Sequence, residues 1–277
     1  MTPRIPIVDC HCHIYPEKVA ARAVAGIGAF YDTPMCMDGT KATLQREAAA
    51  AGITHSMIFS VATKPAQVRS INDFIASEVQ MSGGTMTGLG AMHPDADDPA
   101  ADMAHLLSLG LRGVKLHPDV QGFCIDDPRC MKIYALCEEN GIPGLLHTGD
   151  ARYDMSNPNR LRPMVEHFPA LTVIAAHLGG YSVWDDAQAE LCGLPNLYVD
   201  CSSSLPFMTD ARAVELIRHW GADHVIFGTD YPMWVPKSEV DRFLSLGLTQ
   251  EENEAILWRN AARLFRLDAD MLRSAVR

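Results

Sequence analysis

The feature that most constrains the fold is a series of eight short apolar runs rich in β-forming residues. After a first gap of about 50 residues, the starts of these runs are about 26–31 residues apart. Each interval has room for one strand, one helix and two short loops. The runs begin near Ile5, His55, Met86, Arg112, Pro143, Leu171, Leu197 and Asp223. Eight such units in 277 residues predict an α/β fold, a (β/α)8 TIM barrel that forms a single domain over residues 1–277.

The segments between the runs carry helix signals. Residues 65–81 place apolar side chains at the i, i+3 and i+4 spacing of a helix face. Asp127 is followed by a proline, which is typical of an N-cap and the first helical position. Thr249 and Glu252 form a capping box that predicts a helix start in the C-terminal stretch. The first gap, by contrast, is expected to hold a long loop before its helix.

The apolar runs are nearly continuous, as expected for parallel strands whose two faces are both covered. A doubly wound open sheet is the alternative architecture. Such a sheet usually carries a Gly-rich nucleotide-binding loop after its first strand. Here that place is occupied by His11-Cys12-His13, which favours the barrel.

Charge and composition exclude several classes of protein. The chain has 23 Lys and Arg against 34 Asp and Glu, a net charge of −11, so it lacks the basic footprint of nucleic-acid binding and repels anionic membranes. The 48% apolar and 21% charged fractions exclude general disorder. No apolar run approaches the roughly 20 residues of a spanning helix, and the N-terminus lacks a signal-peptide pattern. We therefore expect a cytoplasmic protein, whose eight cysteines are free thiols.

The unusual number in the composition is 11 histidines. Six of them lie at the C-terminal end of a predicted strand: His11, His13, His93, His117, His147 and His177. That end of a barrel carries the active site. The other five lie at strand starts or in helices and are predicted to be surface or packing residues: His55, His105, His167, His219 and His224.

The first run holds two histidines two residues apart. Strand periodicity places Asp9, His11 and His13 on one face and the two intervening cysteines on the other. Two imidazoles so arranged can converge on one metal ion. Asp230 ends the eighth run, where burial of an unpaired carboxylate would be costly. Coordination of a metal would remove that cost, and three imidazoles with one carboxylate make a set typical of Zn²⁺ with room for water.

Together these motifs resemble the amidohydrolase superfamily and, more narrowly, its amidohydrolase-related family of aminocarboxymuconate-semialdehyde decarboxylase-like and hydrolytic enzymes. The similarity runs from residue 7 to residue 267. It rests on Val8-Asp9-x-His11-x-His13, Gly113-Val114-Lys115-Leu116-His117-Pro118, the strand ending in His147, Ala176-His177-x-Gly179-Gly180, Gly228-Thr229-Asp230-Tyr231-Pro232 and Asn260-Ala261-Ala262-Arg263-Leu264-Phe265.

The resemblance implies a barrel with a divalent metal, usually one Zn²⁺, with Mn²⁺ as another option. The implied ligands are His11, His13, His147 and Asp230. His177 would act beside the metal as an acid–base or polarising group, which makes Asp230 and His177 the implied catalytic residues.

A binuclear site is the alternative arrangement of this family. In binuclear members a carboxylated lysine bridges the two metals from the position of Lys115, and His177 would then join the ligands. Without that modification Lys115 could form an ion pair with Asp9 or with a substrate carboxylate. His117 lies on the same side as Lys115 and is either a wall of the pocket or a structural hydrogen-bond partner.

Contacts with a small-molecule substrate are expected from the strand ends and from the loops that follow them. The planar fork of Arg152 makes it the best candidate for binding a substrate carboxylate, with a surface salt bridge as the alternative. Aromatic side chains in these loops suggest a flat or ring-bearing substrate. The predicted substrate-binding residues are Arg152, Lys115, His117, Tyr15, Tyr181 and Trp234.

Two reaction classes fit these residues. The first is hydrolysis of a small amide, lactone or related carbonyl compound by metal-activated water, with Asp230 moving the proton and His177 polarising the carbonyl. The alternative is non-oxidative decarboxylation of an aromatic or unsaturated carboxylic acid. The compact chain favours hydrolysis, because decarboxylases of this family tend to be longer. A homodimer is also expected, since dimers are common among similar proteins.

Overall fold

A computed structural model describes residues 5–276. It contains strands in all eight predicted runs, so that prediction is confirmed. The strands are β1 (Val8–His13), β2 (His55–Phe59), β3 (Met86–Gly88), β4 (Gly90–Ala91), β5 (Val114–Leu116), β6 (Gly144–Leu146), β7 (Val173–Ala175), β8 (Leu197–Asp200) and β9 (Val225–Ile226). β3 and β4 are two halves of one run, interrupted at Leu89.

The strands are parallel and form a closed ring. Hydrogen-bonded neighbours follow the chain order from β1 to β3 and from β4 to β9. The Leu89 amide donates to the Ile58 carbonyl over 3.0 Å, which joins β2 to the strand formed by β3 and β4. The ring closes where the Cys10 amide donates to the Phe227 carbonyl over 2.9 Å. The predicted (β/α)8 barrel is therefore confirmed.

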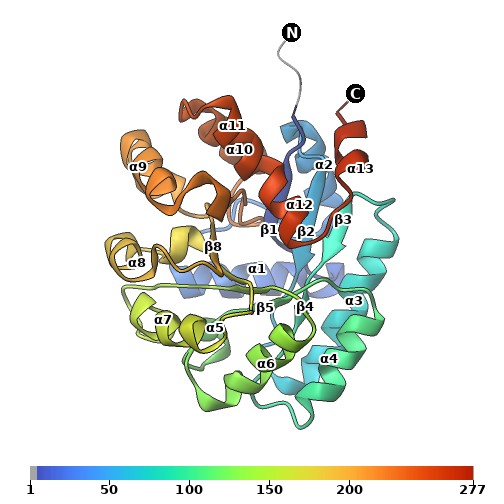
Figure 1. Ribbon diagram of the computed structural model, residues 1–277. Helices are drawn as coiled ribbons and strands as arrows, with labels where there is room; N and C mark the ends of the chain where they lie inside the picture. Colours follow the sequence, from blue (N-terminus) through green and yellow to red (C-terminus); the bar gives the residue numbers. More distant parts are fainter. Residues whose placement is uncertain (1–4, 277) are drawn as a thin grey trace.

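Helices surround the ring (Figure 1). The N-cap at Asp127 and the capping box of Thr249 and Glu252 both form as predicted. The helices are α1 (Glu17–Tyr31), α2 (Lys41–Ala51), α3 (Val68–Gln80), α4 (Pro99–Ser108), α5 (Pro118–Gln121), α6 (Pro128–Glu139), α7 (Pro158–His167), α8 (Trp184–Leu191), α9 (Asp210–Trp220), α10 (Pro236–Ser245), α11 (Gln250–Glu254), α12 (Asn260–Leu264) and α13 (Ala269–Ser274).

The first of these helices corrects the expectation of a long loop after β1. Five alanines give α1 a high helix propensity, which Gly26 and Gly28 partly offset. Of its fifteen residues only Ala20 has a buried side chain, so no apolar stripe revealed the helix in the sequence. In Figure 1, α1 runs across the middle of the molecule.

Two large apolar clusters and one small one form the core. The largest one lies between the strands and the surrounding helices. The second one takes a side chain from nearly every strand and so fills the inside of the ring, where it is closed by Trp258 and Phe265 from the C-terminal segment. Its strand residues are Val8, Cys10, Met57, Phe59, Leu145, Ile174, Tyr198 and Ile226, with Leu89 between β3 and β4.

The pairing of β1 with β2 is irregular between Asp9 and Cys12. This irregularity breaks the predicted alternation, because Cys10 belongs to the inner cluster whereas Cys12 belongs to the outer one. Asp9 also leaves the predicted face and accepts hydrogen bonds from Thr229. Both thiols are buried in the core, and all eight cysteines are unpaired, as expected.

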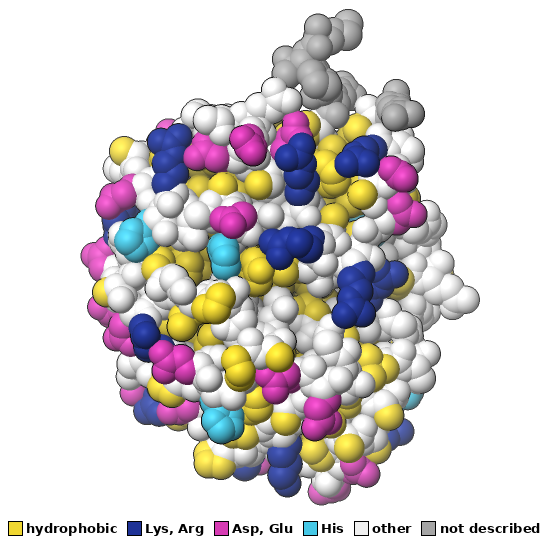
Figure 2. Space-filling view, viewed as in Figure 1, with side chains coloured by type: hydrophobic (Ala, Val, Ile, Leu, Met, Phe, Trp, Pro, Cys, Tyr) yellow, Lys and Arg dark blue, Asp and Glu magenta, His cyan; other side chains and the backbone are white. Residues whose placement is uncertain are grey.

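The surface agrees with the charge argument. On the face in Figure 2, dark blue Lys and Arg side chains are interspersed with magenta Asp and Glu side chains rather than gathered into one basic patch. Within residues 5–276, no helix combines the length and the apolar character needed to cross a bilayer.

Candidate metal centre and substrate pocket

A pocket lies at the C-terminal ends of the strands, where the sequence placed the candidate site. Five histidines and Asp230 line it together with two tyrosines. The lining residues are His11, His13, Tyr15, Ile27, Tyr31, Met35, His117, His147, His177, Asp230, Pro232 and Met233. The barrel thus brings residues from its first, middle and last strands to one cavity.

His11, His13 and Asp230 form the tightest set of donor atoms on one side of the pocket. The Nε2 atoms of His11 and His13 lie 3.5 and 3.8 Å from Asp230 Oδ1. One ligand atom from each residue lies within 4.8 Å of the others, a spacing that a single metal ion can bridge. Three of the four predicted ligands are therefore side by side.

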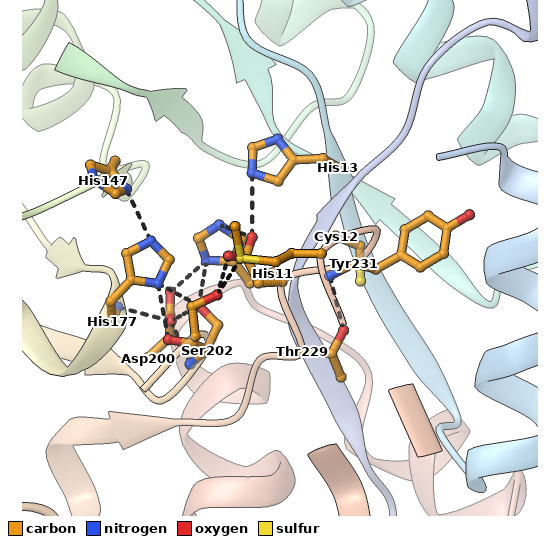
Figure 3. Close-up of polar contacts among 12 residues, drawn as sticks. His11, Cys12, His13, His147, His177, Asp200, Ser202, Thr229 and Tyr231 are labelled. Carbon is orange, nitrogen blue, oxygen red and sulfur yellow. Dashed lines mark hydrogen bonds and ion pairs between the residues drawn. The ribbon is translucent and has the colours of Figure 1, made fainter. Parts of the chain in front are cut away.

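A buried carboxylate orients His11. Nδ1 of His11 donates to Asp200 Oδ2 over 2.9 Å, which leaves the Nε2 lone pair directed toward the pocket. Asp200 Oδ1 accepts from the Ser202 hydroxyl over 2.5 Å (Figure 3). Burial alone would raise the pKa of Asp200, but His11 and these hydrogen bonds hold the pKa below its usual value. A carboxylate behind a histidine is the usual partner of a metal-binding imidazole.

Burial disfavours the charged form of four histidines of the pocket. Burial lowers the pKa of His11, His13, His117 and His147, because the charged form of an imidazole loses its hydration there. A metal ion binds only the neutral form of histidine. The protonation state, the orientation of His11 and the convergence on Asp230 therefore all fit a divalent cation.

A hydroxyl and an indole orient Asp230. The Ser203 hydroxyl donates to Asp230 Oδ2 over 2.5 Å. Trp234 Nε1 in turn donates to the Ser203 oxygen over 2.8 Å. Asp230 Oδ1 is left to face the two histidines. Trp234, a predicted substrate contact, thus lies behind Asp230 and outside the pocket lining.

His147 and His177 lie on the neighbouring wall of the pocket. His177 Nδ1 donates to the Ser202 carbonyl over 2.9 Å, so its Nε2 can accept from His147 Nδ1 at 3.0 Å (Figure 3). The other nitrogen of His147 groups with His117 and Asp119 instead of with His11. His147 shares the pocket with the other predicted ligands, and its role as a ligand stays a prediction.

His117 has both of the roles that the sequence left open. Its Nδ1 accepts from the Val120 amide over 3.4 Å and so caps α5, while its ring lines the pocket. The ring stacks on His147 with a centroid distance of 3.9 Å and an interplanar angle of 7°. Tyr31 Oη bridges the two, 2.8 Å from His117 Nε2 and 3.3 Å from His147 Nε2.

Lys115 is fully buried beside His11. Its Nζ lies 3.2 Å from His11 Nε2 and 5.2 Å from the centre of the Phe59 ring. The suggested ion pair with Asp9 does not form, because the Asp9 oxygens accept from Thr229 and from the His11 amide. Burial lowers the pKa of Lys115 to about 8. A metal on His11 Nε2 would replace Lys115 as its partner, and a binuclear site with a modified Lys115 stays a prediction.

The remaining predicted substrate contacts divide into two groups. Tyr15 lines the pocket. Tyr181 lies one layer out, with its ring 5.6 Å from that of Tyr31. Arg152 lies outside the lining and pairs with Asp150. His93, the sixth histidine at a strand end, lies outside the pocket lining; it is buried and its Nδ1 accepts from the Asp95 amide.

Sequence reasoning missed the roles of Asp200 and Ser203. Asp200 ends a buried strand, as Asp230 follows one, so the argument from the cost of burying a carboxylate applied to both residues. Ser203 had no comparable signal, because a serine after a strand is common in any loop.

The chain is similar to known proteins over most of the barrel. The amidohydrolase family profile matches residues 8–267. The 2-amino-3-carboxymuconate-6-semialdehyde decarboxylase of Dictyostelium discoideum is 24% identical over 238 residues, 72% of this chain and 66% of that protein. The gamma-resorcylate decarboxylase of Polaromonas sp. (strain JS666 / ATCC BAA-500) is 27% identical over 124 residues, 38% of this chain and 37% of that protein. The matches thus span less than two thirds of these curated relatives.

Solved structures share the fold. A TIM-barrel protein from Bordetella bronchiseptica superimposes with a TM-score of 0.77 at 24% identity, covering 95% of this chain and 99% of that one. For 5-carboxyvanillate decarboxylase from Sphingomonas paucimobilis the TM-score is 0.73 at 15% identity, covering 96% and 100%. For a dihydroxybenzoic acid decarboxylase from Polaromonas sp. JS666, solved with manganese, it is 0.72 at 16% identity, covering 97% and 99%. With the family profile matching nearly the whole barrel, this chain belongs to the amidohydrolase family.

Proposed function

We propose that the protein is a metal-dependent, non-oxidative decarboxylase of an aromatic or unsaturated carboxylic acid. The observation that carries the proposal is the convergence of His11, His13 and Asp230 in a pocket that also holds His177. The curated relatives named above are decarboxylases, which favours this reaction over hydrolysis. Chain length, which had favoured hydrolysis, is a weaker criterion because it does not involve the reacting groups.

His11, His13 and Asp230 would hold the metal, with His147 completing the set. When bound, a divalent cation such as Zn²⁺ or Mn²⁺ supplies positive charge that binds substrate oxygens and stabilises negative charge. Asp200 keeps His11 in the tautomer that offers Nε2. Ser203 keeps one oxygen of Asp230 engaged, so that the other faces the substrate.

The chain must also deliver a proton. Decarboxylation breaks the bond between the substrate carbon and its carboxylate, and the electron pair left on that carbon takes up H⁺ as CO₂ leaves. Asp230 and His177 lie on the pocket wall and would carry this proton to the carbon. Burial lowers the pKa of His11, His13, His117 and His147, which favours the neutral form that a metal ion requires.

The wall opposite Asp230 would bind the substrate. Tyr31 and His117 offer hydrogen-bond donors, and Ile27 and Met35 offer apolar surface to a ring. This combination suits a planar acid that carries a polar group at one edge.

The test is to incubate protein loaded with Zn²⁺ or Mn²⁺ with a panel of aromatic and unsaturated carboxylates and lactones in ¹⁸O-labelled water. We expect CO₂ release in amounts equal to product, with no ¹⁸O in the product carbon skeleton. Protein stripped by a chelator is the control and should be inactive. Product that contains ¹⁸O without CO₂ release would establish hydrolysis instead.

A further inference from the structure

Arg152 holds the end of α1 in place. Its Nη1 donates to the Phe30 carbonyl over 2.6 Å. Its Nε and Nη2 donate to the two oxygens of Asp150 over 3.0 and 2.7 Å. The guanidinium therefore joins the loop after β6 to the last turn of α1, two segments far apart in the sequence.

Asp150, the carboxylate that binds the guanidinium, is itself held by several hydrogen bonds. Asp150 is buried, and its Oδ1 also accepts from the Arg152 amide over 2.9 Å. The Asp150 amide donates to Asn157 Oδ1 over 2.9 Å. The guanidinium carbon lies 5.1 Å from the ring centres of Phe30 and Tyr153, which adds two cation–π contacts. Each of the three guanidinium nitrogens of Arg152 thus donates a hydrogen bond to the protein, and Arg152 does not line the pocket.

The rest of α1 buries little surface and has no cap at its start. Ala20 is the single buried side chain among residues 17–31, and the helix starts without a side-chain cap. The Phe30 carbonyl belongs to the last turn, where carbonyls lack partners within the helix and favour a nearby cation. Arg152 supplies both the donor and the charge.

Tyr31 directly follows Phe30, and its ring centre lies 5.3 Å from the guanidinium carbon of Arg152. Because the Val120 amide donates to His117 Nδ1, the His117 proton resides on Nε2 and is donated to Tyr31 Oη at 2.8 Å. Tyr31 accepts this hydrogen bond and keeps its own proton free to donate. In the structure that proton faces His147 Nε2 at 3.3 Å, a long hydrogen bond that an incoming oxygen could replace.

We propose that Arg152 is a positioning residue that keeps Tyr31 Oη at the pocket as the hydrogen-bond donor for a substrate carboxylate or carbonyl oxygen. This inference deepens the proposed function and rests on it for the identity of the substrate class. It assigns Arg152 an indirect role in place of the direct contact with a carboxylate that the sequence suggested.

The first experiment measures hydrogen–deuterium exchange of residues 17–35 in the metal-loaded protein. Arg152→Ala should increase exchange in this segment. Arg160→Ala is the matched control, because Arg160, in α7, pairs with Asp154 of the same loop and with Asp126, and none of these ion pairs involves α1. Unchanged exchange in the Arg152 variant would overturn the positioning role, whatever reaction the protein catalyses.

The second experiment is a double-mutant cycle with Tyr31→Phe. Each single variant should raise KM for the best panel substrate about tenfold, the loss expected for one hydrogen bond to a charged group, with a smaller change in kcat. The double variant should be no worse than Tyr31→Phe alone, because Arg152 acts through Tyr31. Additive losses would show that Arg152 contacts the substrate itself and would refute the proposal.

The double-mutant cycle can also be measured through ligand binding, without any turnover. If no panel compound reacts, the proposed decarboxylase function fails, and the same four proteins are titrated with 2,6-dihydroxybenzoate by calorimetry. A non-additive loss of affinity then supports the role of Arg152 and Tyr31, whereas additive losses or equal affinities refute it. Failure of the positioning role and failure of the proposed function are thus separate outcomes.

Discussion

The two ends of the barrel use buried histidines differently. At the end that holds the pocket, His11 shares Asp200 with Ser202, and its Nε2 meets His13 and Asp230. At the opposite end, buried His55 meets one hydroxyl, that of Thr87 at 2.9 Å. Burial lowers the pKa of the imidazole at both ends. Burial of a histidine therefore does not identify a site, whereas convergence of lone pairs beside a carboxylate does.

The largest effect is expected from a variant that removes one of the converging metal-binding groups at the pocket end. Asp230→Asn should lower kcat about 10³-fold or more, since it takes away both a metal-binding charge and a group that can carry a proton. Turnover of the best panel substrate measures the loss, and circular dichroism with thermal melting verifies that the barrel is intact. Asp241→Asn, at an exposed carboxylate of α10, is the matched control. Near-normal turnover of the Asp230 variant would refute the role assigned to this residue.

The second prediction concerns the opposite end, where no cation is expected. The folded-state pKa of His55 is lowered by burial from 6.5 to about 4. Between these values the unfolded chain binds more protons at this residue, so stability rises with pH across the window and is lost as pH falls. Replacing His55 by Gln should reduce the loss of unfolding free energy between pH 7.5 and pH 5 by about 2 kcal/mol.

Urea unfolding at the two pH values measures this difference. His167→Gln, at an exposed position on α7, controls for the substitution itself. An equal pH effect in both variants would mean that burial at the far end of the barrel does not hold His55 neutral, and the two ends would then differ less than the structure indicates.

The third prediction concerns Asp200, whose hydrogen bond orients His11. Asp200→Asn removes the charge that orients this histidine and should lower zinc affinity about 10- to 100-fold, the usual cost of losing a partner behind a metal ligand. Competition with a chromophoric chelator gives the affinity directly, without any assay of turnover. Unaltered affinity would show that Asp200 only satisfies a buried nitrogen, as Thr87 does for His55.

The smallest effect is expected at Ser203. Ser203→Ala removes one hydrogen bond to Asp230 and should lower kcat/KM about fivefold, which corresponds to about 1 kcal/mol. Ser203→Thr keeps the hydroxyl and should restore most of the activity. If both variants lose activity equally, packing rather than the hydroxyl explains the effect.

Much of the fold could be predicted because parallel strands buried on both faces leave continuous apolar runs in the sequence. α1 could not, since its place depends on Arg152 and on aromatic contacts instead of an apolar stripe. The irregularity in β1 was also invisible, because a period of two assumes regular pairing.

The site was predictable to the extent that strand ends carry its residues. His11, His13 and Asp230 lie together, as predicted from their places at the C-terminal ends of strands. Asp200 also ends a strand and could have been predicted by the same argument. The hydrogen-bond partners of Arg152 and Trp234 could not be predicted, because tertiary packing brings together segments that no local sequence pattern relates.

Closure of the ring between β1 and β9 has a consequence for biosynthesis. His11 lies in the first strand of the ring and Asp230 follows the last, so a growing polypeptide lacks the full donor set until every strand of the ring has been synthesised. Metal uptake would then be one of the last events of maturation. A cation bound by His11 of β1 and by Asp230, which follows β9, would link the two strands that close the ring. It would therefore stabilise only the completed barrel.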